Sequence, residues 1–140
     1  MKKKKRTQEE TTMNNEFYPT PKTLLDKIFA GVNWREIETV LEPSAGKGDM
    51  ASYIREQYRK ASYQDADIDC IEQDSNLAHI LKGEGFPVIH DDFLKFHTGK
   101  QYDLIAMNPP FSNGDEHLLK ALDLQKHGGY IICILNADNN

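Results

Sequence analysis

The sequence has no long hydrophobic run and very little cysteine. A transmembrane helix needs about 20 consecutive apolar residues, and no stretch of the 140 residues approaches that length. No apolar signal-peptide core follows the N-terminus. The two cysteines, Cys70 and Cys133, lie inside apolar runs, which is typical of buried free thiols rather than of a disulfide. These absences predict a cytoplasmic protein without a membrane contact.

The histidines lack the spacing of a metal site. The five of them form neither an HxxxH nor an HExxH pair, and the two cysteines are far apart, so the sequence predicts no metal centre. A hydrophobic content of 39% and a charged content of 28% are typical of one folded domain of this length.

Basic charge is concentrated at the N-terminus. The run "KKKKR" occupies positions 2–6, although the chain has a net charge of −5, so the rest of the chain is more acidic than that figure suggests. Residues 1–15 show no hydrophobic periodicity and are predicted to form a basic disordered tail ahead of a domain at 16–140. A flexible arm that contacts nucleic-acid phosphates is the alternative interpretation.

Short apolar strands alternate with amphipathic helices through the remaining sequence. Pro21 fits the first turn of a helix within 16–32, with Thr20 as its N-cap and Gly31 as its end. Strands are predicted at 38–43, 67–74, 87–93, 102–108 and 129–136, and further helices at 48–60, 75–85 and 116–127, with Ser75 as the N-cap of the second of these. Apolar strands separated by helices predict a mainly parallel sheet covered on both faces, an α/β, Rossmann-like, doubly wound domain.

A glycine-rich loop follows the first predicted strand. Gly46 and Gly48 stand in "EPSAGKGDMA" between that strand and a helix, where a backbone turns tightly and approaches a ligand. The order of residues excludes a Walker loop and matches the dinucleotide fingerprint, so NAD is one candidate and a simple tight turn is another. Glu42 ends the strand, and its carboxylate would repel a pyrophosphate and favour a cationic ligand.

Two later strand ends add acceptors of hydrogen bonds. Glu72 lies at the end of the second predicted strand, where its carboxylate can accept hydrogen bonds from a ribose diol. Asp92 lies at the end of the third predicted strand and could accept a hydrogen bond from an adenine amine, with the backbone of Phe93 beside it. Either acid could instead be an ordinary solvated residue. An ammonium, a ribose and an adenine without phosphates describe S-adenosylmethionine better than NAD.

The sequence "NPPF" at 108–111 directly follows the fourth predicted strand. One proline would suffice to end a strand, because proline has no N–H to donate to a ladder. The second proline, Asn108 and Phe111 therefore exceed the structural requirement. The alternative interpretations are structural: Asn108 as a turn residue and Phe111 as a core residue.

Four segments, in chain order, resemble the S-adenosylmethionine-dependent N6-adenine DNA methyltransferases of the amino-methyltransferase group: "FYPTP", "EPSAGKGD", "IEQD" and "NPPF". The order of motifs is similar to the gamma arrangement, and the resemblance covers about residues 16–136. It implies a class I methyltransferase fold and S-adenosylmethionine as cofactor. The residues that it implies for cofactor binding are Tyr18, Thr20, Pro21, Glu42, Pro43, Ser44, Gly46, Gly48, Glu72, Asp92, Phe93 and Asn108.

In this family the target-recognition region lies C-terminal to the catalytic motif, and the chain stops soon after the fifth predicted strand. We therefore expect a catalytic core truncated after that strand. A partner or a missing C-terminal region would then recognise the target.

The resemblance assigns catalysis to Asn108, Pro109, Pro110 and Phe111. An aromatic amine is a poor nucleophile because its lone pair is delocalised into the ring. The side-chain oxygen of Asn108 and the backbone carbonyl of Pro109 can accept its hydrogens, and the two prolines hold these acceptors in place. Phe111 offers a face on which a flipped base stacks.

The sequence thus predicts transfer of a methyl group from S-adenosylmethionine to adenine N6 in DNA. Methylation of an RNA base or of a protein glutamine amide remains an alternative, as does a non-catalytic remnant that only binds the cofactor.

Overall fold

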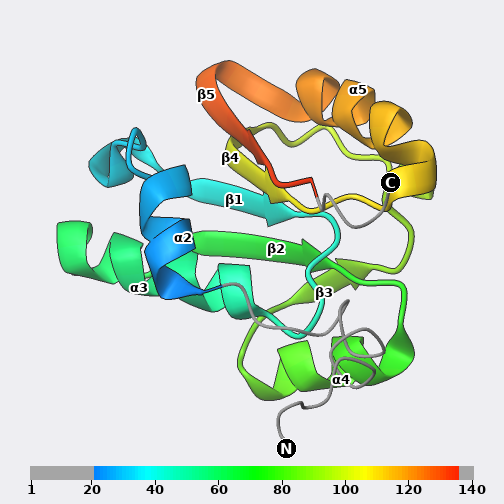
Figure 1. The fold of residues 1–140 in the computed structure, drawn as a ribbon, viewed down its shortest axis with the longest axis horizontal. Helices are drawn as coiled ribbons and strands as arrows, with labels where there is room; N and C mark the ends of the chain where they lie inside the picture. The colour runs from blue at the N-terminus through cyan, green and yellow to red at the C-terminus, as the bar shows by residue number, and fades with distance from the viewer. Residues whose placement is uncertain (1–20, 136–140) are drawn as a thin grey trace, which may run out of the picture.

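Helices and strands alternate along residues 21–135, which are the part of the chain that the computed structural model describes (Figure 1). The elements in chain order are α2 (Lys22–Ile28), η3 (Trp34–Glu36), β1 (Thr39–Glu42), α3 (Asp49–Ser62), β2 (Asp67–Ile71), α4 (Ser75–Gly83), β3 (Val88–His90), η4 (Phe93–Lys95), β4 (Tyr102–Met107), η5 (Phe111–Asn113), α5 (Gly114–Leu124) and β5 (Gln125–Cys133).

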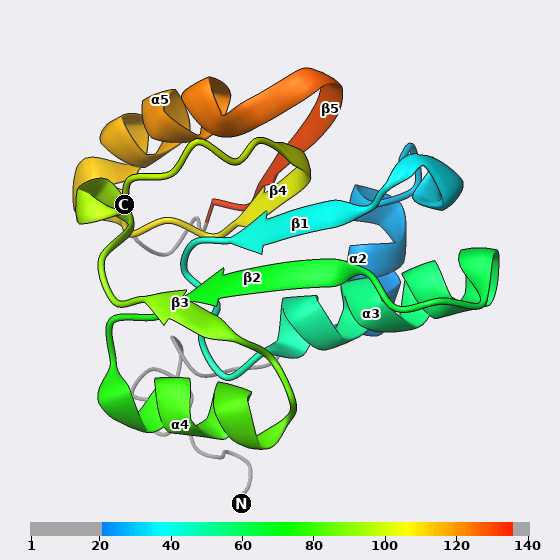
Figure 2. The same ribbon diagram turned by 180° about the vertical axis from the view of Figure 1, so that it is seen from behind.

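The strands form one parallel sheet in the order β3-β2-β1-β4-β5 (Figure 2). β1 is central: Val40 pairs with Ile68 of β2 on one side and with Leu104 of β4 on the other. The chain thus winds outward from β1 through β2 to β3, then returns to the other side of β1 with β4 and β5. This is the doubly wound, Rossmann-like topology that the sequence predicts, and its switch point lies between β1 and β4.

Alternate residues of each strand serve two hydrophobic cores. Val40, Ile68 and Leu104 face the core beneath α2, α3 and α4. Leu41 and Ile105, their neighbours along the chain, face a second core that includes residues of α5 and η4. The strands are apolar on both faces because helices cover both, as expected for a parallel sheet.

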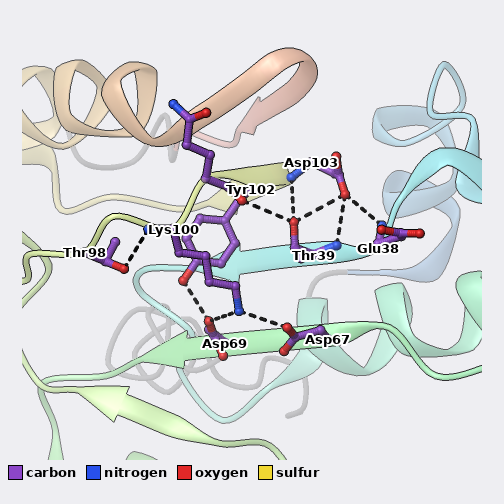
Figure 3. A network of polar contacts seen from close by, with 9 residues as sticks. Glu38, Thr39, Asp67, Asp69, Thr98, Lys100, Tyr102 and Asp103 are labelled. Carbon is purple, nitrogen blue, oxygen red and sulfur yellow. Dashed lines mark hydrogen bonds and ion pairs between the residues drawn. The ribbon is translucent and has the colours of Figure 1, made fainter.

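Polar side chains link β2 to the start of β4 and to the segment just before it (Figure 3). The hydroxyl of Tyr102 donates to Asp69 at 2.7 Å, and Lys100 Nζ donates to Asp69 at 3.0 Å and to Asp67 at 2.9 Å. Asp69 is almost fully buried, so these bonds satisfy a carboxylate that would otherwise be costly to bury. This network lies at the start of the strands, away from the edge that carries the predicted site.

The last helix and strand differ from the prediction. α5 ends at Leu124, and β5 begins at once with Gln125, which pairs with Tyr102 of β4. Periodicity extended the helix to 127 because it cannot register strand pairing. Gly129 permits this pairing: a Cβ there would lie 2.9 Å from the carbonyl oxygen of Asp103.

Two shorter segments also differ from the prediction. Asp74, rather than Ser75, caps α4, and its carboxylate accepts from the N–H groups of Asn76 and Leu77 at 2.8 and 3.0 Å. β3 ends at His90, because Asp92 accepts from the N–H of Leu94 at 3.0 Å and so caps η4. In both places an aspartate that the sequence assigned to a strand end or a loop starts a helical turn instead.

Candidate active site

The loops that follow β1 and β4 meet at the switch point of the sheet. The hydroxyl of Ser44, in the loop after β1, donates to the backbone carbonyl of Asn108 at 3.1 Å. Ligands of doubly wound sheets bind at the carboxyl ends of the strands, in the crevice where the strand order reverses. The two motifs that the sequence singled out, 42–49 and 108–111, are therefore neighbours at this position.

The glycine loop depends on the two glycines. Gly46 has φ +60° and Gly48 has φ +101°, in a region of backbone conformation that L side chains rarely adopt. The N–H of Gly46 donates to Glu72 Oε1 at 2.7 Å. A Cβ on Gly48 would lie 3.0 Å from the side chain of Leu81, so glycine also lets α4 pack closely against the start of α3.

Glu72 links the glycine loop to the end of β2. Its Oε1 accepts from Gly46, and its Oε2 accepts from the N–H of Asp74 at 2.9 Å. The carboxylate is partly exposed, and each oxygen retains further acceptor capacity. Its predicted contact with a ribose diol thus stays compatible with a second function, which is to hold the loop against the sheet.

Glu42 is buried at the end of β1, with an exposed fraction of 2%. Its Oε1 is buried and has no hydrogen-bond partner within the described residues. Burial raises the pKa of this carboxyl well above its ordinary value, and the carboxylates of Asp49 and Glu72 raise the pKa further. Pro43 is buried directly after it. An unpartnered acid at this edge is the kind of group that a cationic ligand satisfies.

Asp92 and Phe93 lie at the end of β3, where the sequence predicts contacts with adenine. One oxygen of Asp92 caps η4, and the residue is half-buried. Phe93 is 2% exposed and belongs to the second core. The side chain of Phe93 thus has a packing role, and the predicted ligand contact in this segment falls to its backbone and to Asp92.

The motif at 108–111 forms the exit from β4. Asn108 and Pro110 are exposed, and Pro109 is buried. Pro110 is extended, with φ −62° and ψ 144°, and precedes η5, which Phe111 begins. A Cβ on Gly114 would lie 3.8 Å from the ring of Pro109, so the start of α5 packs against the motif. The prolines hold an exposed Asn108 beside the glycine loop.

His117 is a neighbour of this site that the sequence did not indicate. It is 7% exposed, its Nδ1 lies 2.9 Å from the carbonyl oxygen of Asn113, and its ring centroid lies 5.5 Å from that of Phe93. It thus joins α5 to η4 and to the end of the 108–113 segment. The signal was its spacing from the other buried residues of α5, Ala121 and Leu124, which places a polar residue on the buried face.

Part of the predicted site and the predicted tail lie outside the described residues. Tyr18, Thr20 and the segment 1–15 belong to this part of the chain. Pro21 is exposed and precedes α2, as its N-cap residue rather than within its first turn.

Within 21–135 no cluster of three or more metal-binding side chains occurs. No helix described between these limits has the length and apolarity needed to cross a membrane.

No protein-family model matches the chain, but curated proteins are similar to it in sequence. The Type II methyltransferase M.CvrRI of Paramecium bursaria Chlorella virus XZ-6E is 32% identical over 92 residues, which are 66% of this chain and 23% of that protein. The tRNA1(Val) (adenine(37)-N6)-methyltransferase of Aliivibrio fischeri is 32% identical over 99 residues, covering 65% of this chain and 40% of that enzyme. The chain thus spans between about a quarter and two fifths of these relatives.

Solved methyltransferase structures share the fold. The plantazolicin methyltransferase BpumL in complex with a desmethylPZN analog and SAH (S-adenosylhomocysteine) superposes with a TM-score of 0.68 at 20% identity, over 91% of this chain and 51% of that one. A putative RNA methyltransferase of Pyrococcus horikoshii gives 0.62 at 25% identity, over 86% and 60%.

The chain therefore has the Rossmann-like fold of the class I methyltransferases. That prediction from the sequence is confirmed.

Proposed function

We propose that this chain binds S-adenosylmethionine and transfers its methyl group to the N6 amine of adenine in DNA. The observation that carries the proposal is the contact between the glycine loop and the "NPPF" segment, through Ser44 and Asn108 at 3.1 Å. This contact supports the proposal because it joins the glycine loop to the segment that resembles the catalytic tetrapeptide of the amino-methyltransferases.

The residues at this edge fit the cofactor. Gly46 leaves the backbone of the loop uncovered, because a Cβ on Gly46 would meet nothing within 4 Å. Glu72 offers acceptors for the ribose, and the orphan oxygen of Glu42 favours the methionine ammonium. S-adenosylmethionine supplies an electrophilic methyl group on a sulfonium.

Asn108 and Pro109 act on the amine that receives the methyl group. The side-chain oxygen of the exposed Asn108 and the carbonyl oxygen of Pro109 accept hydrogen bonds from the two amine hydrogens. The nitrogen then becomes pyramidal, and its lone pair is free to attack the sulfonium methyl. The prolines fix these acceptors before the substrate arrives, which is where electrostatic preorganisation gains rate. Phe111, by its place in the motif, is the residue on which we expect the flipped base to stack.

DNA is the first substrate that we propose, since the Chlorella virus relatives are a Type II methyltransferase and a modification methylase. RNA is the second candidate, because a relative of similar identity methylates adenine N6 in tRNA. This chain spans only part of those proteins. We propose that target recognition depends on a partner or on a further region of the polypeptide.

The experiment that tests the proposal is methyl transfer from labelled S-adenosylmethionine to separate pools of DNA, RNA and protein, followed by nucleoside analysis. We expect the label in N6-methyladenosine or its deoxy form, and the pool that contains it distinguishes the two nucleic acids. Label in glutamine, or in no pool while S-adenosylhomocysteine still binds, would contradict the proposal and favour a glutamine methyltransferase or a non-catalytic remnant.

A further inference from the structure

The buried Glu42 carboxyl has an environment that the cofactor contact alone does not explain. It is 2% exposed, and one of its oxygens has no partner in residues 21–135. A buried carboxylate without a partner is strongly disfavoured, and such a group becomes neutral unless a positive charge accompanies it.

The described groups around Glu42 supply no positive charge. Asp49 in the first turn of α3 and Glu72 after β2 are acidic, and the thiol of Cys70 lies opposite Glu42 in the β1–β2 ladder. On the β4 side, Ile105 pairs with Leu41, and the two residues after it, Ala106 and Met107, are apolar. Lys47, the cation of the glycine loop, is exposed to solvent.

The backbone N–H of Ala51 favours the ionised form of Glu42, but burial and the two carboxylates outweigh it. The interactions at this position therefore favour the protonated form of Glu42 more than water would.

We propose that Glu42 is uncharged in the ligand-free protein and ionises when the cationic amine of the cofactor enters, so that cofactor binding releases a proton. This inference rests on the proposed function, since it takes S-adenosylmethionine or S-adenosylhomocysteine as the ligand. In the step, the O–H bond of the carboxyl breaks, the proton passes to solvent or buffer, and the carboxylate pairs with the ammonium directly or across one water.

This ionisation on binding makes Glu42 a specificity-determining residue. A ligand with an ammonium gains a charge partner in a low-dielectric site, whereas an adenosine without one leaves the acid neutral and gains nothing there. Only the ionised form of Glu42 pairs with the ammonium. The affinity for the amine-bearing ligand therefore rises with pH, by up to about tenfold per pH unit below the pKa of Glu42 in the ligand-free protein.

Calorimetric titration in buffers of different ionisation enthalpy counts the protons released. S-adenosylhomocysteine is titrated into the 140-residue chain between pH 6 and 7, where its amine is already protonated. The matched ligand is 5′-methylthioadenosine, which lacks the amine. Variants are Glu42→Gln, which mimics the neutral acid, and Glu36→Gln, which changes an exposed acid of η3.

We expect the wild type and Glu36→Gln to release up to one proton per S-adenosylhomocysteine bound, with the release falling as pH rises. Glu42→Gln should release none, and its affinity for this ligand should be lower by about tenfold or more. Methylthioadenosine should bind wild type and Glu42→Gln equally and release none.

Binding of S-adenosylhomocysteine with the same proton count in wild type and Glu42→Gln would overturn the inference and leave the proposed function standing. Absence of any binding to the wild type would overturn both. Binding of methylthioadenosine tests whether Glu42→Gln retains a folded adenosine site. If this variant binds methylthioadenosine normally but still releases a proton with S-adenosylhomocysteine, the inference is also overturned.

Discussion

The hydroxyl of Ser44 donates a hydrogen bond to the backbone carbonyl of Asn108 across the switch point of the sheet, at 3.1 Å. The two residues are far apart in sequence, one in the glycine loop and the other in the segment after β4. The bond occupies the carbonyl of Asn108 and leaves its side-chain amide exposed. It therefore couples the position of the "NPPF" segment to that of the glycine loop.

Removal of this hydroxyl tests the coupling. Ser44→Ala should lower kcat about three- to tenfold, because one hydrogen bond of about 0.5–1.5 kcal/mol positions Asn108. S-adenosylhomocysteine affinity, measured by calorimetry, should change little, and Ser44→Thr should restore part of the rate. Ser75→Ala, at an exposed serine of α4, is the control. Equal losses of kcat and of affinity in Ser44→Ala would contradict a positioning role.

Asn108→Ala should reduce methyl transfer by about 10²-fold or more, since it deletes the side-chain oxygen that we propose as an acceptor for the reacting amine. Cofactor affinity should remain near the wild-type value, because the glycine loop is untouched. Single-turnover transfer and calorimetry separate the two effects, with Asn76→Ala on the exposed side of α4 as control. Parallel loss of transfer and affinity would mean that Asn108 holds the cofactor rather than the substrate.

Gly48→Ala and Gly83→Ala should shift stability in opposite directions. At Gly48 the φ of +101° and the 3.0 Å approach to Leu81 should cost about 1–3 kcal/mol. Gly83 lies in α4 with nothing within 4 Å of its Cβ position, so alanine there should stabilise by about 0.5–1 kcal/mol. Urea unfolding measures both, and a neutral Gly48→Ala would show that the loop relaxes freely.

Tyr102→Phe tests the network in Figure 3. It removes the 2.7 Å bond to Asp69 inside the protein, and should lower the free energy of unfolding by about 1 kcal/mol. Tyr63→Phe, at a tyrosine that is 89% exposed, should have no effect. If chemical denaturation finds the two variants equally stable, Lys100 alone satisfies Asp69.

Glu42 should make the ligand-free protein less stable as pH rises. Burial, with Asp49 and Glu72 nearby, raises the pKa of Glu42 well above its ordinary value of 4.5. The folded state then binds more protons than the unfolded state between 4.5 and the raised value, so stability falls with pH across that window.

Glu42→Gln should remove this slope. Thermal unfolding should find the variant more stable than wild type at pH 8 and should find the difference shrinking toward pH 4.5. Glu36→Gln should keep the wild-type slope. A wild-type stability that rises with pH over this range, relative to Glu42→Gln, would contradict a buried neutral acid.

The sequence predicted the order of elements and the parallel sheet because apolar runs of strand length alternate with amphipathic helices from 38 to 135. It also placed the glycine loop at the end of β1 and the "NPPF" segment at the end of β4. It mistook the boundary between α5 and β5, since the pairing of Gln125 with Tyr102 is a contact between distant residues. It assigned the α4 cap to Ser75 because the side-chain contacts of Asp74 are not visible in a pattern.

Local sequence thus determined which acidic and amide side chains stand at the strand ends and where the glycine turn lies. Spacing and residue type suffice to indicate a turn, a strand end or a hydrogen-bond acceptor. Tertiary structure alone decided that Ser44 reaches Asn108, that Glu72 holds Gly46, and that Glu42 is buried with an orphan oxygen. These properties arise where strands far apart in the chain become neighbours, and burial and hydrogen-bond partners exist only once they do.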